Sequence, residues 1–473
     1  LRVVALVDRD PGFGTDRQAS VIADFGAGRQ LSFTCSTQAV PHQSIELLGT
    51  KGRVEIVIPF NAPPATPTAI LIDDGTTLDT SLSRAKFEEL TKDLLERTMT
   101  DFIDGEYDVL CSTAMTVVTE TRLPLLHWGV PMMMRDGLLS TTGSYVAFSM
   151  FNGTLNRLNI PHENLIAEPD SESALRKVQD FAAAAEAKKR LRRTRVGLVG
   201  YTSMSIYPGT FDHAMMRWFV GPEIEHFDSY TLINRAEAVA DIEGALKLYR
   251  AAARFPEGAP DIMVERAAKL YVALKELCRE HDLGAITVKC QYEFSKEYGM
   301  TPCLPLSLLA DNGIVTSCEG DVPCMVSTVI LNYLSGRTAT YGDAIHHEGN
   351  VLKLSPCGFM PFSLGNDGLK NTMVSSYPFF KGLLCSFVMR PGKVTMLRLY
   401  EELGKYSMLC FTGTGIRSEL RGGNMPSLDV IVDGDIETLV NLYPGQHFAI
   451  CYGDVSDRAA MLAGMLGIDM KRI

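Results

Sequence analysis

Hydrophobic and polar positions follow different patterns in successive parts of this chain of 473 residues. In the first 80 residues, short segments with alternating or β-branched residues lie at 31–35, 45–48 and 54–58. A Gly-Thr-Lys-Gly turn at 49–52 joins the last two segments, and this pattern is typical of an antiparallel hairpin. A proline-rich stretch at 59–67 then interrupts regular structure.

From about residue 84 the pattern changes to an alternation of helices and strands. Helices are predicted at residues 83–102, 172–193, 236–253, 261–281 and 322–334, and strands at 107–111, 196–200 and 285–290. This alternation predicts a mostly parallel sheet with helices on both of its faces.

After about residue 350 strands dominate, separated by glycine and proline turns. They are predicted at residues 351–354, 393–399, 407–412, 428–432 and 447–452, before a last helix at 456–466. We therefore expect an α/β protein with Rossmann-like parallel-sheet domains, a β-rich, barrel-like C-terminal domain and an extra antiparallel β segment at the N-terminus. The expected domains span residues 1–80, 81–193, 194–350 and 351–473.

Composition and charge narrow the classes of function. Hydrophobic residues make up 46% and charged residues 21% of the chain, which is ordinary for a soluble globular protein. No uncharged apolar run reaches the roughly 18 to 20 residues of a membrane-spanning helix. The net charge of −11 disfavours binding to nucleic acid. The 11 cysteines include no Cys-x-x-Cys pair, and reduced thiols favour a cytoplasmic location.

Polar residues that can carry chemistry are concentrated between residues 286 and 348. Glu319 and Asp321 follow an apolar stretch and precede a predicted helix, and Asp343 follows that helix. Because the helix returns the chain, we expect the strands that end at Glu319 and Asp343 to lie side by side in one sheet. Two carboxylates at one sheet edge repel each other unless a cation lies between them, and such oxygen-rich sites suit Mn²⁺ or Mg²⁺.

His447, at the start of an apolar strand, is the candidate for a third ligand. Each of these residues also has a structural interpretation. His447 fits a core histidine with satisfied ring nitrogens, Glu319 and Asp321 fit helix N-caps, and Asp343 fits a turn. The residues alone leave both interpretations open.

Three segments resemble the L-fucose isomerase and L-arabinose isomerase superfamily: Cys-Glu-Gly-Asp at 318–321, Gly-Asp at 342–343 and Gln-His at 446–447. The resemblance covers roughly residues 84–473. It implies an aldose–ketose isomerase that works through an ene-diolate, with Mn²⁺ or another divalent cation held by Glu319, Asp343 and His447. The two carboxylates would also move the proton between C1 and C2, and Asp321 would support the site or cap the helix.

The resemblance also implies a small sugar as substrate and a homo-oligomer, and the chemistry of the reaction suggests substrate contacts. Gln291 and Gln446 are candidates to bond sugar hydroxyls, Lys289 is a candidate to bind an oxyanion, and Glu293 is a weaker acid/base candidate. One departure concerns Pro356, which stands where many relatives have a histidine just before a Cys-Gly pair. This departure puts a fourth protein ligand in question and leaves more of the metal open to substrate.

Segments 26–38 and 49–61 resemble a different family, the C-terminal sheet of the Gfo/Idh/MocA sugar dehydrogenases. No strand followed by G-x-G-x-x-G occurs near the start, and the lysine motif of that family is missing. Residues 1–80 are therefore expected to be a remnant without redox activity, followed by a truncated isomerase N-terminal domain at 81–193. A non-catalytic sugar-binding protein and an NAD(P)-dependent sugar dehydrogenase remain as alternatives.

Overall fold

The computed structural model of this chain describes residues 2–10, 12, 16–24, 30–36, 44–49, 52–57, 70–73, 118, 123–141, 144–168 and 171–473. The chain divides into two compact units, Leu1–Tyr107 and Asp108–Ile473. The predicted helix at 83–102, the predicted strand at 107–111 and the proline-rich stretch lie outside the described residues. Among the described helices, none combines the length and the apolar character needed to cross a membrane.

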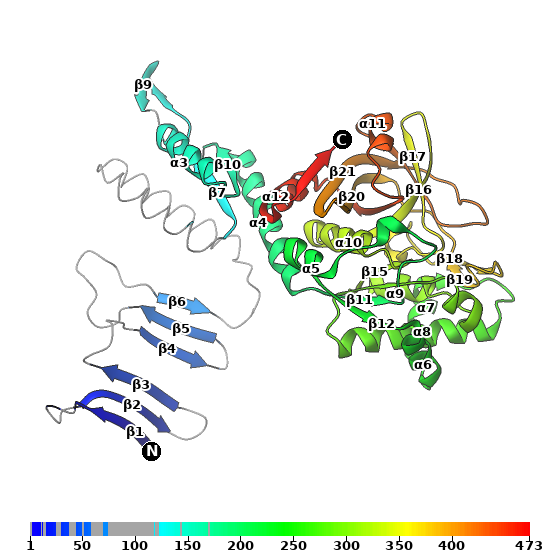
Figure 1. The fold of residues 1–473 in the computed structure, drawn as a ribbon, viewed down its shortest axis with the longest axis horizontal. Coiled ribbons are helices and arrows are strands. Elements are labelled where there is room, and N and C mark those ends of the chain that lie inside the picture. Colours follow the sequence, from blue (N-terminus) through cyan, green and yellow to red (C-terminus); the bar gives the residue numbers. More distant parts are fainter. Residues whose placement is uncertain are drawn as a thin grey trace. The chain divides into compact units, whose positions relative to one another are not determined.

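The first unit contains two antiparallel sheets of three strands each (Figure 1). Their strands are β1 (Arg2–Arg9), β2 (Asp16–Asp24) and β3 (Gln30–Ser36), then β4 (Ser44–Gly49), β5 (Gly52–Val57) and β6 (Ile70–Asp73). Gly49 at the end of β4 pairs with Gly52 at the start of β5, which confirms the predicted hairpin.

The second unit contains a four-stranded parallel sheet in the order β12-β11-β14-β15 (Figure 1). Its strands are β11 (Arg195–Val199), β12 (Glu223–Phe227), β14 (Ala285–Val288) and β15 (Val315–Cys318). Both faces are covered. Val196 and Leu198 pack with α4 (Glu172–Arg193) and α10 (Val322–Ser335), whereas Val199 belongs to another core cluster with α8 (Asp261–Glu280). The predicted parallel sheet between helices is confirmed, and its Rossmann-like character remains a prediction.

The helix predicted at 236–253 is wrong as a single element. The structure has two helices there, α6 (Ser229–Ala238) and α7 (Glu243–Ala252). In the break, a carboxylate oxygen of Asp241 accepts a hydrogen bond of 3.0 Å from the backbone N–H of Glu243. Such local bonds compete with helical bonds, and a hydrophobic pattern that continues through the break does not reveal them.

Six antiparallel strands form a barrel in the C-terminal region. Their order is β20-β23-β16-β17-β22-β21, and pairing between β20 and β21 closes the ring. The strands are β16 (Thr340–Glu348), β17 (Val351–Ser355), β20 (Gly392–Glu402), β21 (Lys405–Ile416), β22 (Leu428–Val432) and β23 (His447–Tyr452). The predicted barrel is therefore present, and its first strand begins before the predicted boundary at residue 350.

Smaller elements complete the second unit. They are β7 (Leu125–Gly129), β8 (Met133–Arg135), β9 (Leu138–Thr141), α3 (Tyr145–Arg157), β10 (His162–Ile166), η1 (Tyr207–Gly209), α5 (His213–Met215), η2 (Met216–Val220), β13 (Ala253–Arg254), η3 (Glu293–Tyr298), α9 (Cys303–Asp311), η4 (Phe362–Leu364), β18 (Lys370–Ser375), β19 (Gly382–Cys385), α11 (Ile436–Asn441), α12 (Ser456–Leu466) and β24 (Asp469–Arg472).

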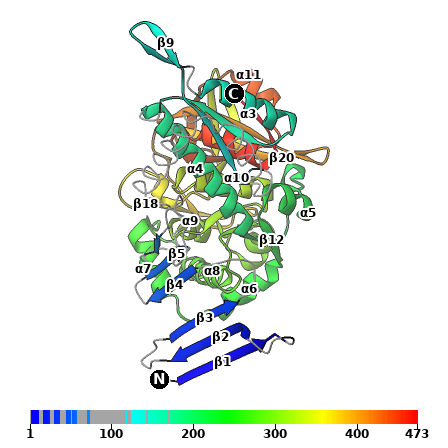
Figure 2. The same ribbon diagram turned by 90° about the vertical axis from the view of Figure 1, so that its left-hand side faces the viewer.

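Helix α10 joins the parallel sheet to the barrel. It packs against β14 and β15 of the sheet and against β20 and β23 of the barrel, and eleven of its residues are buried. Figure 2 shows this region from the side on which α4 lies against α10. Because α10 contacts both layers, the residues that precede it can meet residues of the barrel strands.

Candidate functional site

A strained turn at the end of β15 positions Glu319. Its φ is +73°, which is uncommon for a residue other than glycine, and Gly320 follows with a φ of +68°. The Glu319 N–H donates to the carbonyl of Val288 at 2.8 Å, and the Glu319 carbonyl accepts from the Ser203 N–H at 2.9 Å. A Cβ at Gly320 would lie 2.1 Å from the carbonyl oxygen of Tyr201. The turn therefore requires glycine at this position.

Asp343 and His447 lie opposite each other in the barrel. Asp343 on β16 is the register partner of His447 on β23. The prediction that Asp343 and Glu319 end neighbouring strands of one sheet is wrong, because β15 belongs to the parallel sheet and β16 to the barrel. After α10 the chain enters the barrel instead of returning to the sheet. The two carboxylates nevertheless meet, since β15 and β16 contact each other where the two layers join.

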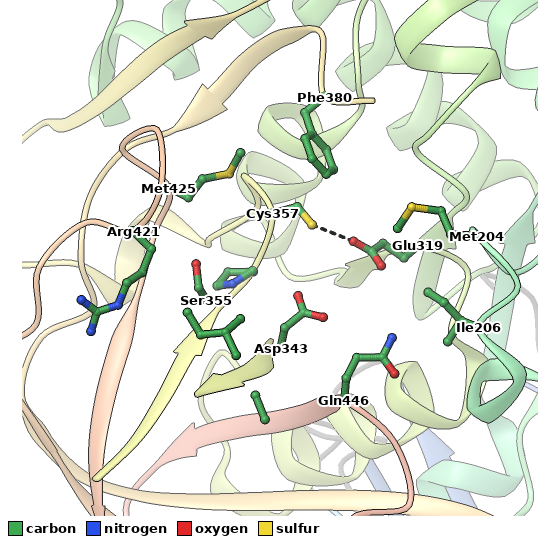
Figure 3. A pocket seen from close by; sticks show the side chains of 14 residues that line it. Met204, Ile206, Glu319, Asp343, Ser355, Cys357, Phe380, Arg421, Met425 and Gln446 are labelled. Carbon is green, nitrogen blue, oxygen red and sulfur yellow. Dashed lines mark hydrogen bonds between the residues drawn. The ribbon is translucent and has the colours of Figure 1, made fainter. Parts of the chain in front are cut away.

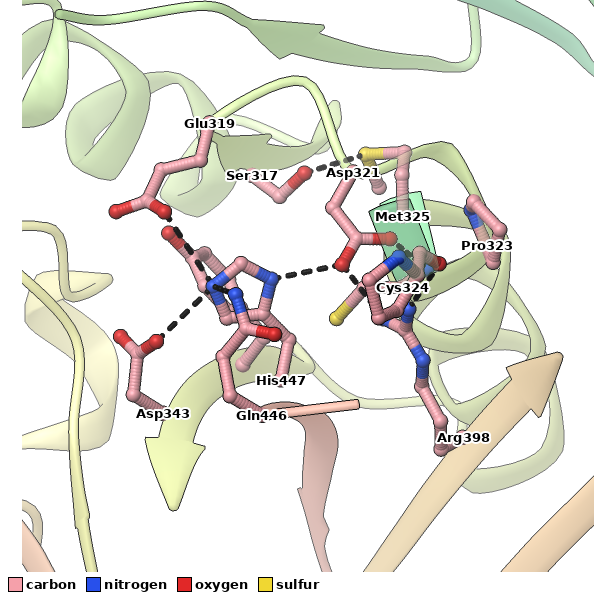
Figure 4. A network of polar contacts seen from close by, with 12 residues as sticks. Ser317, Glu319, Asp321, Pro323, Cys324, Met325, Asp343, Arg398, Gln446 and His447 are labelled. Atoms are coloured by element: carbon pink, nitrogen blue, oxygen red, sulfur yellow. Dashed lines mark hydrogen bonds and ion pairs between the residues drawn. The ribbon is translucent and has the colours of Figure 1, made fainter. Parts of the chain in front are cut away.

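The imidazole of His447 is the centre of this site (Figure 4). Its Nε2 lies 3.0 Å from Oδ1 of Asp343 and 3.4 Å from Oε2 of Glu319. Its Nδ1 lies 2.7 Å from Oδ2 of Asp321. The His447 side chain is completely buried. The structure thus brings the three predicted metal ligands together, with Asp321 behind the ring.

Asp321 holds His447 in place and is itself held by an ion pair. One of its oxygens caps α10 by accepting from the Cys324 N–H at 2.9 Å. The other accepts from Nη1 of Arg398 at 2.8 Å, and both side chains are at most 1% exposed. Arg398 is not among the predicted site residues. A single arginine inside the apolar strand 394–399 is a signal that reveals it, because an arginine is almost never buried without a partner.

Burial and charge shift the pKa values of this cluster in different directions. Burial acts to raise the pKa of Asp321, but Arg398 and His447 hold it at about 2. Burial acts to lower the pKa of His447, but the carboxylates of Asp343, Asp321 and Glu319 raise it well above its usual value. Burial raises the pKa of Asp343 despite the opposing effect of His447. The imidazole and the carboxylates around it thus favour one another's charged forms, whereas burial opposes these forms.

The net charge of this cluster balances that of a divalent metal ion. Glu319, Asp321 and Asp343 contribute three negative charges and Arg398 one positive charge, so two negative charges remain when the imidazole is neutral. The bond from Nδ1 to Asp321 fixes the ring so that Nε2 faces Glu319 and Asp343, which is the usual arrangement of a metal-bound histidine and its carboxylate partner. Carboxylate and imidazole donors together suit Mn²⁺ and related divalent cations.

A pocket of about 500 Å³ opens onto these carboxylates (Figure 3). Glu319, Asp343, Gln446 and Cys357 lie on its wall, and the thiol of Cys357 donates to Oε1 of Glu319 at 2.9 Å. The other residues that line it are Met204, Ile206, Ala344, Ile345, Ser355, Pro356, Phe380, Arg421, Gly422 and Met425. Cys357 is not a predicted site residue, although it directly follows Pro356, which stands where many members of the resembled family have a histidine.

Two of the predicted substrate contacts do not line this pocket. Lys289 forms an ion pair of 2.9 Å with Glu293. Gln291 is completely buried, and neither atom of its amide has a hydrogen-bond partner in the described part of the chain. It directly follows Cys290, whose thiol lies within 4.8 Å of a Glu319 oxygen. Gln446 does line the pocket. The substrate contacts of Lys289 and Gln291 remain predictions.

Known proteins similar to this chain include several isomerases. It is 24% identical to sulfoquinovose isomerase of Priestia megaterium over 391 residues, which are 78% of this chain and 83% of the relative. It is 26% identical to sulfoquinovose isomerase of a Clostridium species over 363 residues, which are 73% of this chain and 80% of the relative.

A shorter similarity is of another kind. The chain is 38% identical to an uncharacterized oxidoreductase of Rhizobium meliloti over 77 residues, which are 16% of this chain and 23% of the relative. That length is close to the length of the N-terminal segment predicted to resemble a dehydrogenase. No protein-family model matches the chain. The long similarities support a sugar isomerase family and a sugar isomerase function for this chain.

Proposed function

We propose that this protein is an aldose–ketose isomerase that depends on Mn²⁺ or a similar divalent cation held by Glu319, Asp343 and His447. The convergence of the two carboxylates on Nε2 of His447, beside a pocket of about 500 Å³, carries this proposal. The charge balance of the cluster supports a divalent cation, and the sugar isomerase relatives support the class of reaction.

The chain's own residues suit the proton transfer of this reaction. A divalent cation supplies stabilisation for negative charge that develops on neighbouring sugar oxygens. Glu319 and Asp343 line the pocket, so either carboxylate can take a proton from one sugar carbon and return it to the next. The amide of Gln446, on the same wall, is placed to bond a sugar hydroxyl. The chain itself covers nearly all of Glu319 and His447, so solvent reaches the site only through the pocket.

A sulfonated sugar is the substrate class that the names of the relatives and one cation in the pocket wall favour. The long relatives are named for sulfoquinovose, a sulfonated sugar, and Arg421 is the one cationic residue among those that line this pocket. Its guanidinium forms an ion pair with Asp429 and turns away from the two carboxylates in Figure 3. Its Nε is buried without a partner in the described part of the chain. Binding of a sulfonate here therefore requires a rotation of this side chain.

A sugar panel in deuterated water tests the proposal. Protein loaded with Mn²⁺ is incubated with sulfoquinovose, L-fucose and L-arabinose, and ketose formation is followed by NMR. We expect one of the three to form a ketose that carries solvent deuterium, because the proton moves through a carboxylate that exchanges with solvent. Glu319→Gln should abolish turnover. Absence of ketose from all three sugars, or a requirement for NAD(P), would contradict the proposal.

An arginine variant tests the choice of sugar. If the sulfonate is bound at Arg421, Arg421→Gln should lower kcat/KM for sulfoquinovose by about tenfold or more, because a charge-assisted hydrogen bond is lost. It should leave turnover of a neutral sugar nearly unchanged. Equal losses for charged and neutral sugars would show that Arg421 acts only on the shape of the pocket.

A further inference from the structure

Cys357 completes a triangle of metal-binding atoms with the two pocket carboxylates. Its Sγ and one oxygen each from Glu319 and Asp343 all lie within 4.8 Å of one another. Donors bound to one divalent ion lie about 3 to 4 Å apart, because metal–oxygen and metal–sulfur bonds are about 2.0 to 2.3 Å long. Side-chain movements of up to about one ångström bring these three atoms into that range.

The thiol also lies on the open side of the site. Cys357 follows β17 and lines the pocket, whereas His447 reaches the carboxylates from the buried side. The thiol contacts Oε1 of Glu319, and the imidazole contacts Oε2. In Figure 3 Cys357 points at Glu319, with Asp343 across from both. Sulfur and imidazole nitrogen therefore approach the carboxylate pair from different directions, as two ligands of one ion do.

We propose that Cys357 is a fourth protein ligand of the divalent metal, bound as a thiolate whose proton leaves to solvent through the open pocket. This inference rests on the proposed metal site. Glu319, Asp343, His447 and Cys357 then supply four donors, and two positions of an octahedral ion are left for neighbouring sugar oxygens. A sulfur donor shifts preference from Mn²⁺ towards softer ions such as Co²⁺ and Zn²⁺.

Titration of the full-length apoprotein with Co²⁺ tests this ligand. Visible d–d bands report Co²⁺ in a protein site, and sulfur-to-cobalt charge-transfer absorption in the near ultraviolet reports a bound thiolate. We expect wild type to show both signals. Cys357→Ser should keep the visible bands and lose the charge-transfer absorption, and its Co²⁺ affinity should fall on the order of tenfold relative to its Mn²⁺ affinity. Cys357→Ala, which cannot bind metal at this position, should behave in the same way.

A buried thiol near Glu319, that of Cys290, provides the matched control. Sγ of Cys290 also lies within 4.8 Å of a Glu319 oxygen, together with Sγ of Cys318. We expect Cys290→Ser to keep the charge-transfer absorption. Absorption that survives in Cys357→Ser, or that disappears only in Cys290→Ser, overturns the proposal. Visible bands without charge transfer in wild type also overturn it while leaving the proposed metal site intact. Failure of wild type to bind Co²⁺ or Mn²⁺ contradicts the proposed metal site itself.

Discussion

His447 has its two ring nitrogens in different roles. Nδ1 lies 2.7 Å from Asp321, which fixes the ring, and Nε2 faces the carboxylates of Asp343 and Glu319. A histidine whose far nitrogen is bound to a carboxylate is a more basic and better oriented metal ligand than a free one. Asp321, on the buried side of the site, therefore orients His447 and makes it a stronger metal ligand beside the pocket carboxylates.

Replacement of Asp321 by asparagine tests this effect of Asp321 on His447. Asp321→Asn keeps the size of the side chain but removes the charge that holds Nδ1 of His447. We expect the affinity for Mn²⁺ to fall by about 10- to 100-fold, measured by equilibrium dialysis. Asp435→Asn is a matched control, because Asp435 caps α11 in the same way but lies on the surface and not in the cluster. Unchanged Mn²⁺ affinity in Asp321→Asn would contradict this role.

The ion pair between Arg398 and Asp321 is buried, so removal of either partner would leave an uncompensated charge in the protein interior. Arg398→Leu leaves the Asp321 carboxylate without its guanidinium, and we expect the free energy of unfolding to fall by about 3 kcal/mol. The readout is a denaturant titration monitored by circular dichroism. A loss below about 1 kcal/mol, the range of exposed pairs, would show that the pair is not important for stability.

Acid should weaken the same network in a defined range. The pKa of Asp321 is lowered to about 2 from a usual value of 3.8, so its contribution is complete above about pH 4 and is lost as the pH falls towards 2. Over that range we expect wild type to lose about 2 kcal/mol more stability than Asp321→Asn. If the free energy of unfolding falls equally with pH in the two proteins, the lowered pKa of Asp321 is contradicted.

At the scale of the element, the turn after β15 decides where Glu319 points. Its residues have φ values of +73° at Glu319 and +68° at Gly320, and the chain passes close to the carbonyl of Tyr201. Gly336, which ends α10, has a φ of +63° but has open space where a Cβ would lie. Both glycines have a positive φ, but a Cβ would be crowded only at Gly320. A comparison of the two positions therefore separates the cost of the backbone angle from the cost of crowding.

Alanine at these two glycines should have unequal effects. Gly336→Ala should lower the free energy of unfolding by about 1 kcal/mol, the cost of a left-handed residue. Gly320→Ala should cost clearly more and should abolish Mn²⁺ binding, because its Cβ would meet the Tyr201 carbonyl at 2.1 Å and displace Glu319. Thermal unfolding with a parallel Mn²⁺ assay measures both effects. Equal effects of the two substitutions would contradict the close approach of residue 320 to the carbonyl of Tyr201.

The elements also show which parts of the fold can be predicted from sequence. Most strands of the barrel, and β11 and β14 of the parallel sheet, follow local hydrophobic patterns and were predicted, whereas β12 (Glu223–Phe227) was not. The pairing of Asp343 with His447 depends on how distant strands meet, and no local pattern records that. Cys357 was not identified for the same reason, since it acquires its role only through Glu319, a partner far along the chain. Arg398 was missed although a lone arginine in an apolar strand marks a buried charge that needs a partner.

At the scale of the whole molecule, every residue of the candidate site lies in the second compact unit, Asp108–Ile473. We therefore expect a protein truncated to residues 108–473 to bind Mn²⁺ with nearly the affinity of the full chain. Circular dichroism establishes that the truncated protein is folded before metal is added. A folded protein of this length without metal affinity would show that residues 1–107 contribute to the site.

The most direct test of the central claim is Mn²⁺ binding measured by electron paramagnetic resonance of the free ion. Wild type should bind one Mn²⁺ per chain, and Glu319→Gln, Asp343→Asn and His447→Ala should each remove that binding while leaving the fold intact. The exposed His346, a neighbour of Asp343 on β16, gives the control His346→Ala, which should bind like wild type. Wild type that binds no Mn²⁺ would contradict a metal centre at these three residues. Variants of these residues that bind Mn²⁺ as tightly as wild type would contradict it as well.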